Sequence, residues 1–425
     1  MSPIAQRLLP DTATVGHDGW LEIGGVSVEA LAEEFGTPLF VYDEAHLRAR
    51  CRESVAAFGP ECVVYATKAF LCRAMARLAY DEGLLLDVAS GGELHVALAA
   101  GVPASACTVH GNNKSGAELR EAIEAEVRYI VVDSFDELDR LDVLAATGVG
   151  PTPRVVLRIT PGVHAHTHEF IATGQDDSKF GFNLANGDAL RAVDHARRSS
   201  AMELIGLHCH IGSNVFEASS FAKAAEVMAD FAVPLDLPEL ILGGGLGVAY
   251  VEGEEAPTIT QWGNVVLDAC NALGVRSRVS VEPGRAIVAA AALTLYTVGT
   301  IKQIPGVRTY VAVDGGMSDN PRPVLYGSGY ESFLPRALAA DRELTVRLVG
   351  KHCESGDVLA FAAPVPSDIA VGDLLAMPVT GAYGHSMGSN YNKITRPPVV
   401  FVADGAARLV VRRETYDDLL ATDLG

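Results

Sequence analysis

The chain has 425 residues, 49% of them hydrophobic, and a formal net charge of -20 at pH 7. This length predicts two domains, because single hydrophobic cores seldom grow beyond about 250 to 300 residues. The acidic balance argues against nucleic acid as a partner, since binding a polyanion requires clustered Lys and Arg.

The cysteines and the apolar runs predict a cytoplasmic protein without a membrane role. The seven cysteines are scattered and form no Cys-x-x-Cys pair, which is typical of reduced thiols. Residues 1–9 lack the apolar stretch of a signal peptide. The most apolar run, residues 286–295, is far shorter than the ~20 residues that span a bilayer.

The first segment of the chain that resembles regular structure is residues 20–28, which has the composition of a β-strand. We expect it to join a mainly β domain with the C-terminal part of the chain. This assigns residues 1–42 to the β domain.

From residue 63 onward, short β-branched runs alternate with amphipathic stretches, as in the βα units of a parallel sheet. Residues 71–82, 92–100 and 115–127 have clear helical spacing of apolar residues. The expected strands number eight: residues 63–68, 84–89, 107–111, 129–134, 155–160, 205–210, 239–243 and 279–284. Eight strands separated by helices predict an α/β fold of the TIM type, a (β/α)8 barrel spanning residues 43–289.

The connection after the fifth strand, residues 161–183, is long, rich in His, Gly and Asp, and without a clear period. It favours a functional loop or lid over a simple crossover. After residue 289 the pattern changes to period-two alternation with turns. Residues 296–303, 309–314, 344–350, 357–362 and 373–379 are expected strands, and 399–413 a hairpin turning at Asp404-Gly405. Residues 290–425 therefore complete an antiparallel β-barrel or sandwich.

The predicted barrel strands end in polar residues, at the edge where barrel enzymes carry their chemistry. Any one of these polar residues is explained by the exposure of a strand end to solvent. The whole set is harder to explain in that way. The set is Lys68, Asp87, His110, Asp133, Arg158, His210, the run Gly243 to Gly245, and Glu282.

These residue types suit an aldehyde cofactor with a phosphate. Glycines after the seventh strand let backbone N–H groups approach an anion, although a tight turn alone would also explain them. Lys68 ends an apolar strand, where burial would lower its pKa toward the neutral amine that attacks carbonyls. Glu282 is placed to pair with a pyridinium nitrogen and His210 to stack on the ring. Such an electron sink is what the loss of an α-carboxylate as carbon dioxide requires.

A metal-dependent hydrolase is the alternative from a different class. His208 and His210 share a strand face, and His164, His166 and His168 lie close together in the long connection. A solvated polar loop explains the last three better, and the sequence fixes no carboxylates aligned with the histidines. We therefore expect no metal.

Six motifs, in order along nearly the whole chain, resemble the diaminopimelate decarboxylases, which are alanine-racemase-like, fold-type III pyridoxal-phosphate enzymes. They are Tyr65-Ala66-Thr67-Lys68-Ala69, His208-Cys209-His210-Ile211-Gly212-Ser213, Gly243-Gly244-Gly245, Glu282-Pro283-Gly284-Arg285, Cys353-Glu354-Ser355-Gly356-Asp357 and Gly381-Ala382-Tyr383.

The resemblance implies a role for each matched residue. Lys68 would carry pyridoxal 5'-phosphate as a Schiff base, Ser213 with the Gly243 to Gly245 backbone would hold the phosphate, and Tyr383 would close over the cofactor. Asp87 at its strand end would also belong to the cofactor site. Cys353 and Glu354 resemble residues that the partner subunit contributes, with the thiol donating a proton, which implies a homodimer with shared active sites.

The resemblance also implies an amino-acid substrate charged at both ends. Arg285, Arg322 and Tyr326 resemble the clamp on the distal carboxylate of diaminopimelate, and guanidinium groups suit that carboxylate. Glu354 would meet the distal ammonium. Lysine or ornithine would leave the two arginines without an anion. The expected reaction is decarboxylation of meso-2,6-diaminopimelate to L-lysine and carbon dioxide, the last step of lysine biosynthesis.

Two alternatives share the cofactor: a decarboxylase of another diamino or polyamine-type acid, and a non-catalytic paralogue that binds it. The chain departs from the common family pattern at Phe70, where Asn is usual, and at Asn214, where Gln is frequent. Residues 165–179 resemble the family's mobile segment over the active site.

Overall fold

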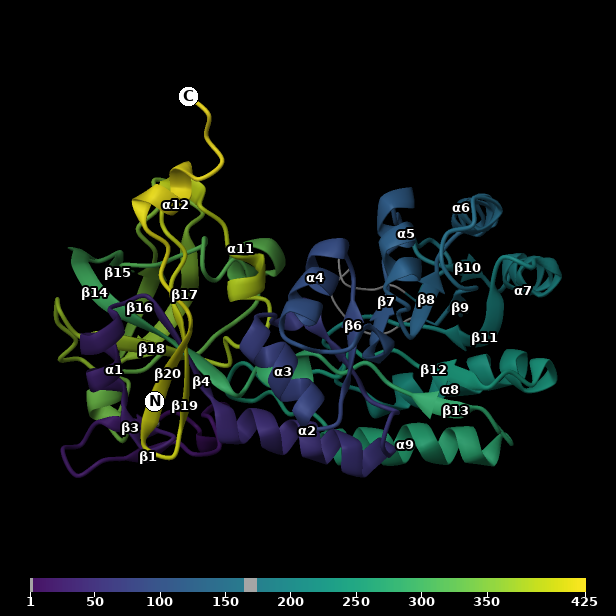
Figure 1. The fold of residues 1–425 in the computed structure, drawn as a ribbon. Helices are drawn as coiled ribbons and strands as arrows, with labels where there is room; N and C mark the ends of the chain where they lie inside the picture. Colours follow the sequence, from purple (N-terminus) through teal and green to yellow (C-terminus); the bar gives the residue numbers. More distant parts are fainter. Residues whose placement is uncertain (1–2, 164–173) are drawn as a thin grey trace. The chain divides into compact units, whose positions relative to one another are not determined.

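The computed structural model describes residues 3–163 and 174–425 (Figure 1). The chain divides into two compact units. The first unit contains residues 1–49, 249–255 and 287–425, and the second contains residues 50–248 and 256–286. Residues 249–255 cluster with the first unit although they follow the seventh barrel strand in the sequence.

The second unit is a closed barrel of eight parallel strands, as predicted. Its neighbouring strands pair in parallel in the order β13-β12-β11-β9-β8-β7-β6-β5. A parallel bridge between Val63 and Val281 closes the ring, and Val64 N donates to Val281 O at 2.9 Å. The strands are β5 (Val64–Ala66), β6 (Leu85–Val88), β7 (Cys107–Val109), β8 (Tyr129–Val132), β9 (Arg154–Thr160), β11 (Glu203–His208), β12 (Glu239–Ile241) and β13 (Arg278–Ser280).

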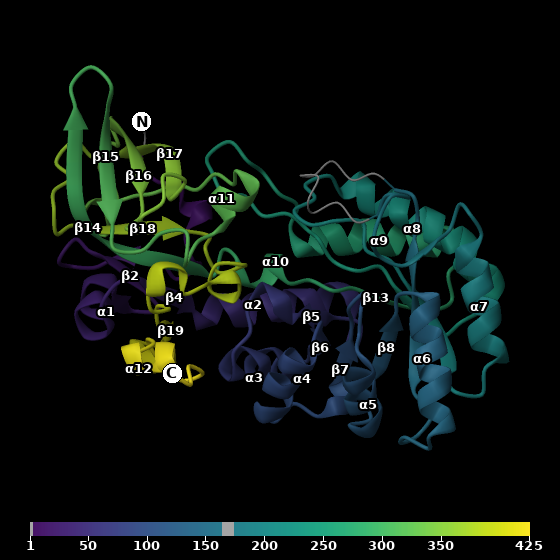
Figure 2. The ribbon, with the colours of Figure 1, turned by 90° about the horizontal axis from the view of Figure 1, so that it is seen from above.

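Helices follow the barrel strands along the chain and lie outside them (Figure 2). Several begin at a Ser or Thr whose side chain accepts from the third helical N–H, which satisfies an otherwise unpaired donor. They are α3 (Arg73–Asp81), α4 (Gly91–Ala99), α5 (Gly116–Glu124), α6 (Phe135–Ala146), α7 (Asp188–Arg198), α8 (Ala218–Ala232) and α9 (Ile259–Ala272). The preceding helix α2 (Glu44–Phe58) spans the boundary between the two units.

The barrel interior is packed rather than hollow. Tyr129, Val131, Val156, Ile205 and Ile241 form one buried cluster contributed by four neighbouring strands. A filled interior leaves only the two ends of the barrel for ligands.

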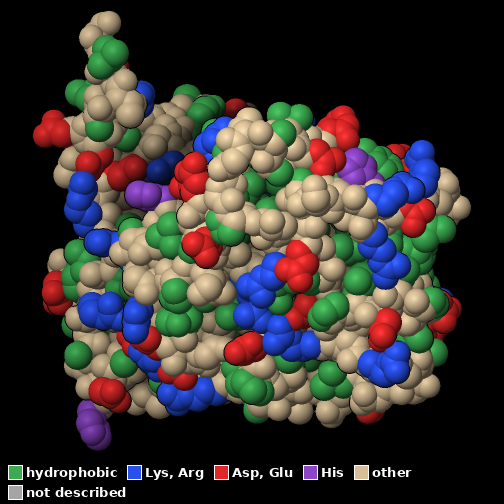
Figure 3. Space-filling view, turned by 45° about the vertical axis from the view of Figure 1, so that its right-hand side comes forward, with side chains coloured by type: hydrophobic (Ala, Val, Ile, Leu, Met, Phe, Trp, Pro, Cys, Tyr) green, Lys and Arg blue, Asp and Glu red, His purple; other side chains and the backbone are tan. Residues whose placement is uncertain are grey.

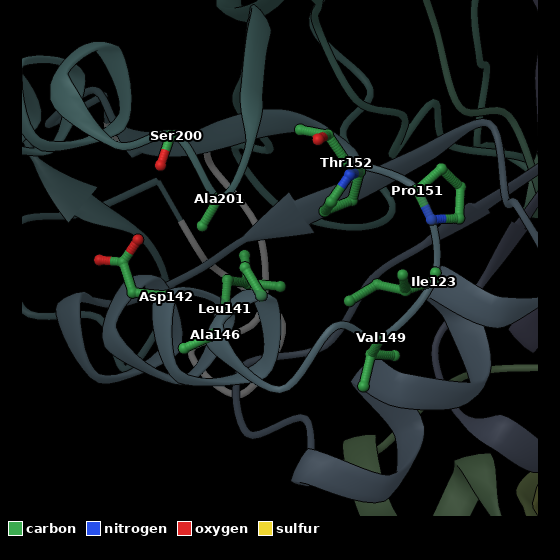
Figure 4. A pocket seen from close by; sticks show the side chains of 12 residues that line it. Ile123, Leu141, Asp142, Ala146, Val149, Pro151, Thr152, Ser200 and Ala201 are labelled. Atoms are coloured by element: carbon green, nitrogen blue, oxygen red, sulfur yellow. The ribbon is translucent and has the colours of Figure 1, made fainter.

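A pocket of about 360 Å³ lies at the amino end of the strands. It is lined by residues such as Leu141, Pro151 and Ala201, and Pro153 and Ala201 precede β9 and β11 (Figure 4). Chemistry in such barrels occurs at the opposite end. This pocket is therefore not the candidate site.

The long connection after β9 contains a short strand, β10 (Phe182–Asn183), that pairs with β9. Gly181 N donates to Asp133 Oδ2 at 3.0 Å, which fixes the end of the connection to the end of β8. His164, His166 and His168, and most of the segment 165–179, lie outside the described residues.

The first unit is built on a mainly antiparallel sheet in the order β17-β16-β15-β14-β4-β19-β20, with β18 also paired to β14. The strand β4 (Leu39–Asp43) brings the N-terminal segment into this sheet. The predicted hairpin is present, and Asp404 and Gly405 both have positive φ, as a tight I′-type turn requires. The C-terminal strands are β14 (Ala292–Ile304), β15 (Arg308–Val313), β16 (Leu344–Val349), β17 (Val358–Val365), β18 (Leu374–Pro378), β19 (Val399–Ala403) and β20 (Ala406–Val411).

The prediction of a single strand over residues 20–28 is wrong. The segment forms a hairpin of β2 (Leu21–Ile23) and β3 (Val26–Ser27), with β1 (Thr14–Val15) beside β2 and helix α1 (Val28–Phe35) following. Gly24 and Gly25 reverse the chain at φ values of 59° and 78°, which glycine adopts without strain. The short helices α10 (Arg285–Val288), α11 (Arg322–Tyr326) and α12 (Tyr416–Leu420) complete the fold.

The cysteines form no disulfide, and the surface is mixed in charge. All seven cysteines are present as thiols. On the face drawn in Figure 3, Lys and Arg side chains are interspersed with Asp and Glu. Within residues 3–163 and 174–425, every helix falls short of the length and apolar character that a bilayer span demands.

Candidate active site

A buried polar cluster at the carboxyl end of the barrel strands is centred on Glu282, two residues beyond β13. His110 Nε2, from the end of β7, lies 2.9 Å from Glu282 Oε1. His208 Nε2, from the last residue of β11, hydrogen-bonds Glu282 Oε2 at 2.9 Å. Asp87 on β6 lies 3.7 Å from His110. Three of the predicted strand-end residues, Asp87, His110 and Glu282, are thus brought together.

Glu282 is an anion in this setting. Burial by itself raises the pKa of a carboxyl, but the two imidazoles outweigh it and hold the pKa of Glu282 well below its ordinary value. Its Oε1 accepts no well-aligned hydrogen bond within the part of the chain that the structure describes. A buried carboxylate oxygen with this spare capacity fits a protonated ring nitrogen.

Lys68 lies in the turn Thr67–Ala69 immediately after β5, so the predicted position at a strand end is right. The predicted burial is wrong, because the Lys68 side chain is exposed. The chain leaves the strand at Ala66 and turns, which carries the side chain away from the packed interior. The positive charge of Lys68 helps to lower the pKa of His210 and partly offsets the rise in the pKa of His110, so the amine acts on both imidazoles of the cluster.

Glu93 is a neighbour of Lys68 that the sequence analysis missed. Its Oε2 accepts from Thr67 Oγ1 at 3.0 Å and from Ala89 N at 2.6 Å. A signal was available, because Ser90 and Glu93 have the spacing of a capping box at the start of α4. Ser90 does accept from Glu93 N, but the carboxylate reaches the turn that carries Lys68.

His210 is a neutral imidazole next to the glycine run. Burial, followed by the charges of Lys68 and Arg158, holds the pKa of His210 well below its usual range. Its Nδ1 accepts from Gly244 N at 3.3 Å, as an unprotonated nitrogen must. A flat neutral ring held in this way fits stacking on an aromatic cofactor.

The glycine run after β12 approaches its neighbours more closely than any side chain would allow. A Cβ on Gly244 would lie 1.9 Å from Glu282 O, and one on Gly245, where φ is 105°, would lie 1.9 Å from Gly212 O. These contacts join the loop after β12 to those after β11 and β13. Glycine is therefore needed for the cradle that the sequence predicts for a phosphate.

Gly244→Ala is expected to break this cradle, because the added methyl group meets backbone rather than a flexible side chain. We expect the dissociation constant for pyridoxal phosphate to rise by about tenfold or more, since a backbone shift there misplaces the N–H groups that would donate to the phosphate. Equilibrium dialysis measures it. Gly116→Ala is the control for loss of a glycine, since a Cβ there meets nothing within 4 Å and its φ lies outside the left-handed region. An unchanged cofactor affinity in Gly244→Ala would contradict the proposed cradle.

Ser213 and Arg285 meet next to the glycine run. Arg285 Nη2 donates to Ser213 Oγ at 2.9 Å, and Arg285 is buried. Val215 N, two residues after Ser213, donates to Gly245 O at 2.9 Å. A hydroxyl and a guanidinium beside a glycine cradle fit an anion such as phosphate.

Arg322, in α11, belongs to the first unit. It is 4% exposed and lies between two aromatic residues, with its Cζ 4.2 Å from the ring of Tyr250 and its Nη1 donating to Tyr330 Oη at 2.5 Å. Its Nε has no acceptor among the described residues. Tyr326 follows one helical turn later on the same face.

The remaining predicted residues of the first unit, Cys353, Glu354 and Tyr383, lie in loops. Cys353 and Glu354 are exposed, and Cys353 N donates to Asn392 Oδ1 at 3.0 Å. Tyr383 has φ of 60°, an unfavourable backbone for a bulky residue, and such strain concentrates at functional sites.

Among residues 3–163 and 174–425, two groups of His and acidic side chains are close enough to share an ion: His110 with His208 and Glu282, and Asp139 with Asp142 and His195. The carboxylate aligned with His208, which the sequence did not reveal, is therefore Glu282. The first group is the centre already described, and the spare capacity of Glu282 Oε1 fits a ring nitrogen.

Comparison with known proteins gives concordant matches. Residues 44–289 match the family model described as the pyridoxal-dependent decarboxylase, pyridoxal binding domain. The chain is 46% identical to the diaminopimelate decarboxylase of Corynebacterium efficiens, over 98% of this chain and 94% of that protein. It is 47% identical to that of Bacillus subtilis, over 98% of each. The diaminopimelate decarboxylase of M. jannaschii in complex with L-lysine has a similar structure, with a TM-score of 0.90, 34% identity and 98% coverage of both chains.

Proposed function

The chain belongs to the diaminopimelate decarboxylase family of pyridoxal-dependent decarboxylases, and from this premise we propose the part that each of its residues takes in the reaction. The enzyme is a pyridoxal-phosphate-dependent carboxy-lyase that converts meso-2,6-diaminopimelate to L-lysine and carbon dioxide. The observation that supports the assignment of residues is the meeting of Glu282, His210, the glycine run and Lys68 at the carboxyl end of the barrel.

Pyridoxal phosphate supplies, when bound, an electron sink for the pair left behind as carbon dioxide departs. Lys68 holds it through the amine, and Glu282 faces its ring nitrogen. Neutral His210 stacks on the ring, and Asp87 supports the same site. Ser213 and the Gly243 to Gly245 backbone hold the phosphate, and Tyr383 covers the cofactor.

Arg285, Arg322, Tyr326 and Glu354 are proposed to select a substrate charged at both ends. Arg322 is the strongest case, because a buried guanidinium between aromatic rings with an unused Nε fits a carboxylate. Arg285 donates to Ser213, which is proposed to hold the phosphate. The proposed substrate-binding residue Arg285 therefore lies next to the proposed phosphate site. The assay that tests the function is carbon dioxide release from diaminopimelate compared with lysine, ornithine and arginine. Release from those three at the diaminopimelate rate would contradict the assignment.

Arg322→Lys is expected to raise KM for diaminopimelate by about 10- to 100-fold, because an ammonium cannot replace a fork-shaped donor to a carboxylate. Steady-state kinetics measures it. Arg308→Lys is the matched control, since Arg308 also lies over a tyrosine ring, that of Tyr310, but is exposed. If KM for diaminopimelate stayed at the wild-type value, Arg322 would not bind the distal carboxylate.

We propose further that the enzyme works in the cytoplasm as a homodimer with shared active sites. Seven cysteines without a disulfide among them support a reducing compartment. Cys353 and Glu354 are exposed on this chain. Their exposure supports their use by a partner subunit, because side chains on the surface of one subunit can reach the active site of another. Analytical ultracentrifugation tests the dimer, and a monomer at assay concentration would contradict shared sites.

A further inference from the structure

Glu282 is held by two imidazoles, and neither has a part in the reaction described so far. His208 reaches Oε2 from β11 and His110 reaches Oε1 from β7, each at 2.9 Å. The two rings are 5.1 Å apart and meet edge to face. His208 is 1% exposed and His110 7% exposed, so both contacts with Glu282 are buried.

The pKa values of the two histidines shift in opposite directions. Burial alone would lower the pKa of His110, but Asp87 and Glu282 raise it above its ordinary value. Burial lowers the pKa of His208, which therefore is a neutral donor through Nε2. The other ionisable groups acting on this cluster are Lys68 after β5, Arg158 on β9, and Cys209 and His210 after β11.

We propose that His110 and His208 are positioning residues that keep Glu282 ionised and oriented, so that the proton shared with the cofactor's ring nitrogen stays on the nitrogen. This rests on the proposed role of Glu282 at that nitrogen. The physical reason is desolvation: a buried carboxyl without donors favours its neutral form and would keep the proton itself. A neutral donor on one oxygen and an imidazole with a raised pKa beside the other stabilise the carboxylate.

The experiment follows the ring nitrogen directly. Holoenzyme loaded with pyridoxal phosphate labelled with ¹⁵N in the ring is observed by NMR across a pH series, together with kcat and KM. His208→Leu and His110→Leu remove the contacts, and His208→Gln retains a neutral donor near the Nε2 position. His195→Leu is the matched control, because His195 Nε2 also contacts a carboxylate, Asp142, at 2.8 Å in the same unit.

In the wild type, His195→Leu and His208→Gln, the nitrogen signal is expected to be that of the protonated ring. In the two cluster leucine variants we expect it to move toward the unprotonated position, with the apparent pKa lower by about one unit, a tenfold change. We expect kcat to fall by about 10- to 100-fold, as for other supporting residues, and KM to change little. If the leucine variants fail to fold, His208→Asn, whose shorter amide misses Glu282, replaces His208→Leu.

A nitrogen that stays protonated in folded cluster variants overturns the inference. Glu282→Gln separates this failure from failure of the proposed function. If Glu282→Gln loses the ring proton while the histidine variants keep it, only the role of His110 and His208 is wrong. If Glu282→Gln also keeps the ring proton, the proposed role of Glu282 is itself wrong.

Discussion

Lys68→Ala is expected to lower the rate of decarboxylation by at least about 10³-fold. The reason is that noncovalent binding of the cofactor does not replace the covalent bond that the Lys68 amine forms with it. The purified variant should also lose the visible absorption of lysine-bound pyridoxal phosphate. The glycine run, Ser213 and Glu282 are untouched, so the variant should still bind the cofactor without a covalent link. Mass spectrometry after borohydride reduction measures that link.

Two variants control for the loss of a lysine. Lys302→Ala removes an exposed lysine from β14 in the first unit and should leave both readouts at the wild-type level. Lys68→Arg keeps the positive charge beside His110 and His210 but has no amine for a carbonyl, so it should behave like Lys68→Ala. A reduced, cofactor-bearing peptide recovered from Lys68→Ala would assign the covalent bond to another residue.

The location of the site was predictable because alternation of strands and helices fixes where the carboxyl ends of strands meet. Asp87, His110 and Glu282 come from different strands, and their approach needs only the closure of the barrel. Pairing within the site was not predictable. That both His110 and His208 contact Glu282 depends on side-chain directions at the ends of β7, β11 and β13, which spacing in the sequence does not encode.

Local turns account for the two errors. Lys68 was expected to be buried because an apolar strand precedes it, yet the turn Thr67–Ala69 exposes its side chain. The segment 20–28 was taken as one strand, although Gly24-Gly25 in its middle is a turn signal for a hairpin. In both places the composition of the segment predicted a strand but did not predict where the backbone leaves it.

Cys353→Ala is expected to lower kcat by about 10²- to 10⁴-fold, the range for losing a positioned proton donor. The loop is held in place by its neighbours rather than by the thiol. Buried His352 Nδ1 contacts Asp357 Oδ2 at 2.8 Å, and Asn392 accepts from Cys353 N, so removing the sulfur should leave the loop intact. Stopped-flow absorbance and steady-state kinetics measure the loss. Cys62→Ala, at a half-buried thiol, is the control.

Mixing Lys68→Ala with Cys353→Ala is expected to restore activity that neither variant has. If each site takes Lys68 from one subunit and Cys353 from the other, a mixed dimer contains one site with both changes and one with neither. Random exchange makes half the dimers mixed, so the mixture should reach about a quarter of wild-type activity. A mixture as inactive as its parts, after subunit exchange is verified by mass spectrometry, would place Cys353 and Lys68 in the same subunit's site. The exposure of Cys353 and Glu354 would then need another explanation, because the thiol would have to reach the reacting carbon within its own chain.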